Sequence, residues 1–264
     1  MRRVHLLLFC LCSLPAFAQD GFVALFNGRD LSGWDVEPGL WRVQDGIIIG
    51  TSEVGRPKTN SFLIWRGTVR DFELRVTIRV VGDNNSGVQY RSRRLPEITP
   101  WTIQGYQCDV HPVDVHTAMT YEERGRGIFG YNGVDVVMDP SGQRWQVGER
   151  PPVTADLAQW NEFAVIARGN RLEHKLNGRT TSVFIDHDEK NRALSGLVAL
   201  QLHAGTPHTI QVKQVLLKTL DAGPVLHFDA AALPPGARKI DKPRVVSAQG
   251  RNPPPKKTGA PGPK

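Results

Sequence analysis

The chain has 264 residues, of which 40% are hydrophobic and 22% charged, and its formal net charge is +7. That charge is concentrated at the two ends, because residues 19–229 contain 23 basic and 25 acidic residues. A surface that binds nucleic acid must itself carry positive charge, so this distribution argues against a nucleic-acid partner.

The N-terminus has the layout of a secretory signal. Arg2 and Arg3 precede an apolar stretch over residues 4–14, and the small residues Ala16 and Ala18 stand at −3 and −1 of a cut before Gln19. We therefore expect residues 1–18 to be a signal peptide and the protein to be exported, to the periplasm or beyond the cell. The rest of the chain has no apolar stretch long enough to span a membrane.

Removing such a signal leaves a single cysteine, Cys108, so that no intramolecular disulfide can form. The fold must then be stabilised by its core. One large β domain over residues 19–220 would bury enough apolar surface.

Strand patterns follow one another along this region. A hairpin is predicted around Asp45-Gly46, and residues 72–80 alternate apolar and polar side chains with period two. A second hairpin is predicted around Asn177-Gly178, followed by strands at 197–202 and 210–220. No segment of helical length has an apolar stripe, so the pattern predicts an all-β sandwich or barrel.

The composition changes after Leu220. Prolines, lysines and arginines dominate residues 221–264, which predicts a tail that is disordered towards its end. Its positive charge could hold it to anionic polymers of the cell envelope, although a solvated tail explains the same composition.

Polar residues alternate on three of the predicted strands. They are Gln89 and Arg91 on the first, Gln107, Asp109 and His111 on the second, and Gln201 and His203 on the third. Residues two apart on a strand share a face, so these seven side chains would line one surface if the strands lie in one sheet. Amide, carboxylate, imidazole and guanidinium groups suit the recognition of sugar hydroxyls, whereas an ordinary wet face is richer in Lys, Glu and Thr.

A further polar stretch lies at residues 121–127. Tyr121, Glu122 and Glu123 are followed by Arg124 and by glycines, which favours a loop at the rim of the site or a salt-bridged surface loop.

Seven short segments in this order resemble the 3-keto-disaccharide hydrolase (DUF1080) family. One is Asn85-Ser86-Gly87-Val88-Gln89-Tyr90-Arg91; the others are residues 25–34, 105–109, 121–127, 160–162, 176–178 and 195–205. The resemblance covers residues 22–220 and implies a concanavalin A-like jelly-roll β-sandwich. It also implies activity on glycosides that carry a ketone at C3. We predict no cofactor from the sequence. Residues 110–120 depart from the family pattern, which leaves the substrate preference open.

The chemistry of a 3-keto-glycoside suggests roles for these residues. The ketone acidifies the C2 proton, so a base can remove it, the enolate can expel the C1 substituent, and water can add to the product. We expect Asp109 to be the base, Arg91 or His203 to stabilise the enolate, and Glu122 or Glu123 to act as the acid or hold the water. Hydroxyl groups would be oriented by further polar residues: Gln89, Gln107, Gln201, Arg124, Tyr121 and His111.

Other functions remain open at this point. A divalent metal could be held by Asp109, His111, Asp114, His116 and His203, although the spacing of the histidines matches no established ligand motif. The same sandwich could be a lectin-like carbohydrate-binding module without catalysis, or a structural surface protein. An ordinary glycanase is disfavoured, because this fold commonly places its catalytic carboxylates in a Glu-x-Asp-x-x-Glu strand, which is missing from the sequence.

Overall fold

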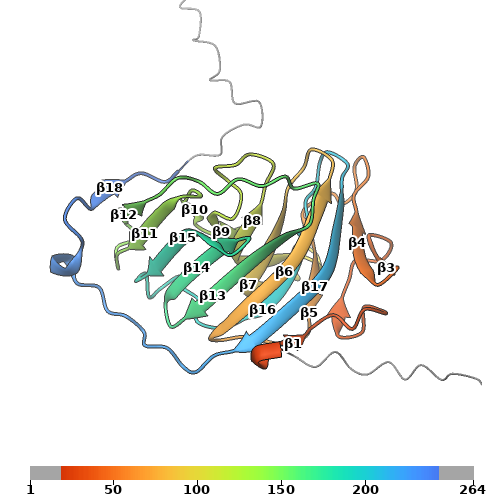
Figure 1. Ribbon diagram of the computed structural model, residues 1–264, viewed down its shortest axis with the longest axis horizontal. Coiled ribbons are helices and arrows are strands. Elements are labelled where there is room, and N and C mark those ends of the chain that lie inside the picture. Colours follow the sequence, from red (N-terminus) through yellow and green to blue (C-terminus); the bar gives the residue numbers. More distant parts are fainter. Residues whose placement is uncertain (1–18, 244–264) are drawn as a thin grey trace, which may run out of the picture.

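Strands make up nearly all of the regular secondary structure of the described residues, as the alternating patterns predict. The computed structural model describes residues 19–243, and within them the helical elements are two 3₁₀ segments, η1 (Gln19–Gly21) and η2 (Ala230–Ala232). The strands form two sheets that lie face to face in two layers (Figure 1). The fold is therefore the jelly-roll β-sandwich that the sequence predicts.

The larger sheet has eleven strands among the described residues. In order they are β18 (Arg238–Ile240), β12 (Arg144–Glu149), β11 (Val134–Met138), β15 (Arg179–Asp186), β14 (Arg171–Leu176), β13 (Asn161–Arg168), β6 (Phe72–Val81), β17 (Thr209–Thr219), β4 (Ile47–Thr51) and β3 (Trp41–Gln44), with β1 (Val23–Ala24) beside β17. The two predicted hairpins are confirmed, because Asp45-Gly46 joins β3 to β4 and Asn177-Gly178 joins β14 to β15. All four turn residues have positive φ, as a tight primed turn requires.

The smaller sheet has seven strands within residues 19–243. In order they are β10 (Gly127–Gly130), β9 (Thr120–Glu123), β8 (Ile103–Val110), β7 (Ser86–Arg94), β16 (Leu197–Leu202), β5 (Ser61–Trp65) and β2 (Trp34–Asp35). The three strands with alternating polar residues, β7, β8 and β16, are neighbours in this sheet. The hypothesis that they share one sheet is thus confirmed.

Apolar side chains of the two sheets meet in a large core between them. Tyr90 of β7 stacks on Tyr106 of β8 with ring centroids 5.6 Å apart, and Phe129 of β10 stacks on Phe184 of β15 at 4.2 Å. Cys108, also on β8, is buried in the same core as a free thiol. With one face of β7, β8 and β16 committed to this core, their alternate residues must point to the outer face of the smaller sheet.

Two expectations about boundaries change. Residues 121–123 were predicted to be part of a loop, but they belong to β9, and the turn to β10 begins at Arg124, which has φ 53°. The folded region also continues beyond the boundary that we placed at residue 220, since β18 pairs antiparallel with β12 and extends the larger sheet. The predicted signal, residues 1–18, and the end of the predicted tail, residues 244–264, lie outside the described residues.

Candidate functional site

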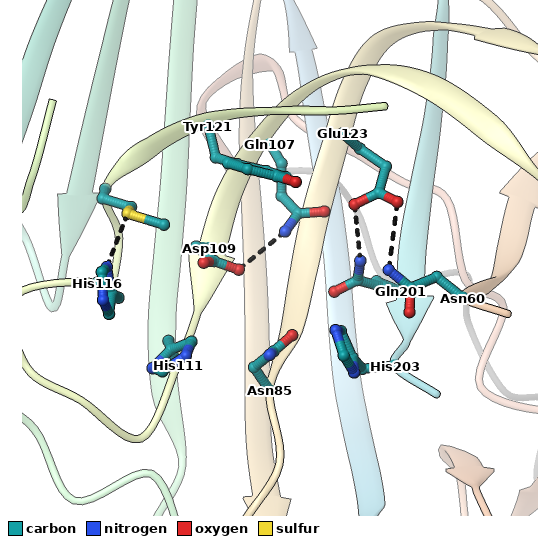
Figure 2. A pocket seen from close by; sticks show the side chains of 11 residues that line it. Asn60, Asn85, Gln107, Asp109, His111, His116, Tyr121, Glu123, Gln201 and His203 are labelled. Carbon is teal, nitrogen blue, oxygen red and sulfur yellow. Dashed lines mark hydrogen bonds between the residues drawn. The ribbon is translucent and has the colours of Figure 1, made fainter. Parts of the chain in front are cut away.

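A polar pocket of about 200 Å³ lies on the outer face of the smaller sheet. Its walls come from β5, β7, β8, β9 and β16 and from the segments next to them (Figure 2). The residues that line it are Asn60, Asn85, Gln107, Asp109, His111, His116, Met119, Tyr121, Glu123, Gln201 and His203.

Asp109 lies on one side of the pocket and is only 5% exposed. Gln107 Nε2 donates a hydrogen bond of 2.8 Å to Asp109 Oδ1. Gln107 is itself oriented by residues of β7. Its Oε1 accepts a hydrogen bond from Gln89 Nε2, and Gln89 Oε1 accepts one from Ser92 Oγ at 3.0 Å. This chain of neutral donors fixes the position of the carboxyl group without supplying a positive charge.

Burial without a cation raises the pKa of Asp109 to about 8, and the negative charge of Glu123 contributes to the rise. The hydrogen bond from Gln107 acts in the opposite direction and only partly offsets it. Near neutral pH the carboxyl group therefore exchanges its proton readily, as a general acid or base must.

A glycine makes room for this arrangement. Gly87 of β7 lies opposite Asp109 of β8, and a Cβ at Gly87 would stand 2.3 Å from Cδ of Gln107. Only a residue without a side chain lets the Gln107 amide lie flat across β7 and reach Asp109.

Glu123 forms the opposite side of the pocket. Asn60 Nδ2 donates to its Oε1 at 3.2 Å and Gln201 Nε2 donates to its Oε2 at 3.3 Å. Burial raises its pKa, while these two amides and Arg124, 3.9 Å away, limit the rise. Strands β7 and β8 separate β9 from β16, so the Glu123 and Gln201 side chains reach toward each other over these two strands.

Gln201 leaves one polar atom unsatisfied. Its Nε2 is engaged by Glu123, but its buried Oε1 has no hydrogen-bond partner among residues 19–243. In Figure 2 this oxygen points into the pocket between Asp109 and His203. A buried acceptor without a partner costs free energy, so the position is suited to a ligand hydroxyl or a water molecule.

The remaining wall carries the hydroxyl of Tyr121 and the imidazoles of His111 and His203, next to that of His116. Burial raises the pKa of Tyr121 to about 12, so its hydroxyl keeps its proton. Burial also lowers the pKa of His111 to about 4, with further contributions from His116 and His203, and it lowers the pKa of His203. Both imidazoles are therefore neutral near pH 7.

Seven of the eleven predicted site residues line this pocket. They are Asp109, Glu123, His203, Gln107, Gln201, Tyr121 and His111. The other four, Gln89, Arg91, Glu122 and Arg124, lie outside it. Gln89 is completely buried beneath Gln107 and cannot touch a ligand, and Arg124 lies in the β9–β10 turn.

Arg91 does not share the face of Gln89, which corrects the expectation from spacing. Its backbone has φ 47°, and the pairing of β7 with β8 shifts register between Tyr90 and Arg93. An irregularity of this kind breaks the strict alternation of a strand. The guanidinium instead binds Asp71 at 2.9 Å and the carbonyl of Gly169 at 2.7 Å, so Arg91 joins segments of the fold and cannot stabilise an enolate in the pocket.

Glu122 also points away from the pocket. Because 121–123 is a strand, Tyr121 and Glu123 face the pocket and Glu122 faces the sandwich interior. There Glu122 binds Arg126 at 2.9 Å, and Arg126 binds Asp186 at 2.7 Å. The choice between Glu122 and Glu123 thus falls on Glu123.

Four lining residues were not among the predicted site residues. His116 and Met119 come from residues 110–120, the stretch that departs from the family pattern, and the His111 and His116 rings lie 4.8 Å apart. Asn85 begins one of the family motifs, and its place in that motif is the signal that could have identified it as a lining residue. Asn60 lies just before β5, and nothing in its local sequence marks it.

Two further observations concern metals and membranes. Within residues 19–243, no three His, Cys, Asp or Glu side chains are grouped so that they could hold a metal ion. The same part of the chain has no helix that is long and apolar enough to cross a membrane.

The chain belongs to a family of carbohydrate-related proteins. The sequence model of the 3-keto-alpha-glucoside-1,2-lyase-like domain matches residues 21–218, which is most of the chain. The pocket lies entirely within the matched region. A search of curated protein sequences gave no match.

Similar folds are found among solved structures. Two candidate glycosyl hydrolases from Parabacteroides distasonis align with TM-scores of 0.52 and 0.51, at 20% and 16% identity. The first alignment covers 76% of this chain and 95% of the other, and the second covers 75% and 99%. A carbohydrate-binding module from Bacillus subtilis aligns with a TM-score of 0.48 at 16% identity, over 71% and 96% of the two chains. At these identities the similarity establishes the fold alone.

Proposed function

We propose that this protein cleaves 3-keto-glycosides by removing the C2 proton and eliminating the C1 substituent, and that it then adds water to the product. The observation that carries the proposal is the buried Asp109, whose pKa of about 8 makes it a stronger base than an ordinary carboxylate. Family membership supports the substrate class, since the name of the matching domain, 3-keto-alpha-glucoside-1,2-lyase-like, describes an elimination across C1 and C2 of a 3-keto-glucoside.

The reaction uses groups that face the pocket. Asp109 takes the C2 proton, the electron pair moves to the C3 oxygen, and the enolate then expels the glycosidic oxygen from C1, which takes up a proton. The products are an alcohol and a 2-hydroxy-3-keto-glycal. Tyr121 supplies a neutral O–H donor, and Glu123 with its raised pKa can carry the proton that the leaving oxygen needs.

The size of the pocket limits what enters it. A volume of about 200 Å³ is below that of sites for drug-sized ligands, which begin at about 300 Å³. The 3-keto sugar ring therefore occupies the pocket, and the group attached at C1 extends beyond it. This favours selectivity for the ketone-bearing ring and tolerance toward the other half of the glycoside.

The test is incubation of the full chain with 3-keto-trehalose beside trehalose, with separation of the products by chromatography. Release of 3-keto-glucose or its glycal from the keto sugar alone supports the proposal. Binding of either sugar without cleavage would instead favour a lectin-like module, and cleavage of trehalose would remove the role of the ketone.

We also propose that the protein acts after export. The N-terminal signal pattern supports this, and fractionation of producing cells tests it. Retention of the protein in the cytoplasm with its signal uncleaved would contradict it.

Deletion of residues 244–264 should leave cleavage of the 3-keto-glycoside unchanged, because the pocket lies wholly within the described residues.

A further inference from the structure

Two of the imidazoles that line the pocket, those of His111 and His203, are held by the backbone in opposite ways. The backbone N–H of Val113 donates to Nδ1 of His111 at 3.0 Å. At the other imidazole, Nδ1 of His203 lies 2.6 Å from the carbonyl oxygen of Ala204. A carbonyl oxygen can only accept, so Nδ1 of His203 must carry a hydrogen, whereas Nδ1 of His111 must not.

These contacts determine what the second nitrogen of each ring can do. With Nδ1 acting as an acceptor, His111 is neutral and its hydrogen is on Nε2. With Nδ1 acting as a donor, neutral His203 has a lone pair on Nε2. One imidazole therefore presents an N–H donor and the other a basic nitrogen.

The two rings stand at the same edge of the pocket. In Figure 2, His111 lies below Asp109, His203 lies below Gln201, and Asn85 lies between the two rings. The unsatisfied Oε1 of Gln201 is on the His203 side. A water molecule there could donate one hydrogen to Gln201 Oε1 and the other to His203 Nε2.

We propose that the two histidines serve different halves of the reaction: His111 Nε2–H stabilises the enolate oxygen during elimination, and His203 Nε2 activates the water that hydrates the glycal. This inference rests on the proposed function. In the hydration half, the water oxygen bonds to C1, its proton passes to His203, and C2 regains a proton from Asp109, so that water and glycal give 3-keto-glucose with no other reactant. His203 then returns its proton to solvent, Glu123 regains from solvent the proton that it gave to the leaving oxygen, and Asp109 is left as the carboxylate that begins the next turnover.

The assignment changes one expectation from the sequence. His203 was considered as the enolate stabiliser, but the neutral ring has no hydrogen on the nitrogen that remains available. His111, which was expected only to orient hydroxyl groups, has that hydrogen.

The tautomers can be measured without any substrate. Long-range ¹H–¹⁵N spectra of the full chain labelled at histidine nitrogen distinguish the two neutral forms, and His111→Gln and His203→Gln assign the signals. We expect His111 as the Nε2–H form and His203 as the Nδ1–H form at pH 7. The same tautomer at both positions, or a charged ring at either, would overturn the inference.

The division of labour is tested by product analysis with 3-keto-trehalose and with the isolated glycal. His203→Gln should slow hydration of the isolated glycal at least 10-fold more than it slows elimination, so that the glycal accumulates. His111→Phe should slow elimination about 100-fold, the effect of removing one oxyanion donor. His111→Gln, which restores an N–H near Nε2, should recover at least 10-fold of that loss.

The outcomes separate the two proposals. If the wild type leaves 3-keto-trehalose intact, the proposed function fails, and the spectra still decide the tautomers. If the wild type cleaves it but His203→Gln slows both halves equally, or the wild type does not hydrate the glycal, the role of His203 is wrong. Circular dichroism and thermal melting check that each variant is folded. If His203→Gln does not fold, His203→Asn replaces it in the same test.

Discussion

Two clusters of buried carboxyl groups flank strand β9, one on each face. On the outer face, Glu123 and nearby Asp109 receive hydrogen bonds from the neutral amides of Asn60, Gln201 and Gln107. On the inner face, Glu122 and two further carboxylates, Asp186 and Asp188, surround Arg126. Burial is similar on the two faces, but the partners are not.

The difference in partners decides the electrostatics. Burial alone would lower the pKa of Arg126, yet its hydrogen bonds to Glu122 and Asp186 raise it, so Arg126 stays protonated at every pH of interest. In the pocket, burial without an adjacent arginine raises the pKa of Asp109 to about 8. A carboxyl group becomes chemically useful here because its partners are neutral, whereas the same group beside arginine contributes to structure.

The largest effect is expected from Asp109→Asn, which keeps the shape of the side chain and removes the base. We expect kcat on 3-keto-trehalose to fall about 1,000-fold, within the range that general bases contribute. Full turnover by this variant would remove Asp109 from the mechanism.

The same substitution should stabilise the fold at high pH. Because the folded pKa of Asp109 lies above the ordinary value of 3.8 for an aspartate, the unfolded chain releases this proton between about pH 4 and pH 8 while the folded chain keeps it. Ionisation of Asp109 therefore costs stability as pH rises through that interval, by up to about 1.4 kcal/mol per pH unit. Asp109→Asn should melt higher than the wild type at pH 8 and equally at pH 4; a lower melting temperature at pH 8 would contradict the raised pKa.

On the inner face, Arg126→Gln should act on stability instead of chemistry. Removing one partner leaves three buried carboxylates without their cation, which typically costs about 3–5 kcal/mol and would lower Tm by roughly 10 °C. Below the melting temperature, kcat should change less than about 3-fold. Arg171→Gln is the control, since its ion pair with Glu173 is 40% exposed on the arginine side and should contribute under about 1 kcal/mol.

The pH profile of the wild type gives a smaller effect. The base must be ionised, so on the limb that Asp109 controls kcat/KM should rise about 10-fold per pH unit up to about pH 8. Of the other titratable groups in the pocket, His111 is already neutral and Tyr121 still protonated across this range. Glu123→Gln removes a negative charge that raises the pKa of Asp109, so it should move the midpoint of the profile to lower pH. An unchanged midpoint would show that the charge of Glu123 does not influence the pKa of Asp109.

The smallest effect is expected from Gly87→Ala. The added Cβ would displace the Gln107 amide, and the hydrogen bond that lowers the pKa of Asp109 would be lost. We expect a several-fold fall in kcat/KM at pH 7 and a midpoint at higher pH. Gln107→Leu, which removes the same hydrogen bond without crowding β7, should give the same shift; a shift in only one of the two would show that Gly87 has another role.

Local patterns in the sequence determined the all-β fold, the two primed hairpins and the common sheet of β7, β8 and β16, because period-two alternation and turn chemistry act over a few residues. They also identified Asp109, Gln107 and His203 as pocket residues. Only the tertiary structure excluded Arg91 and Glu122: a local irregularity redirects Arg91, and the strand at 121–123 turns Glu122 to Arg126. It alone supplied Asn60, whose partner Glu123 lies far along the chain, and the opposite tautomers of His111 and His203, because these depend on the conformation of the backbone beside each ring.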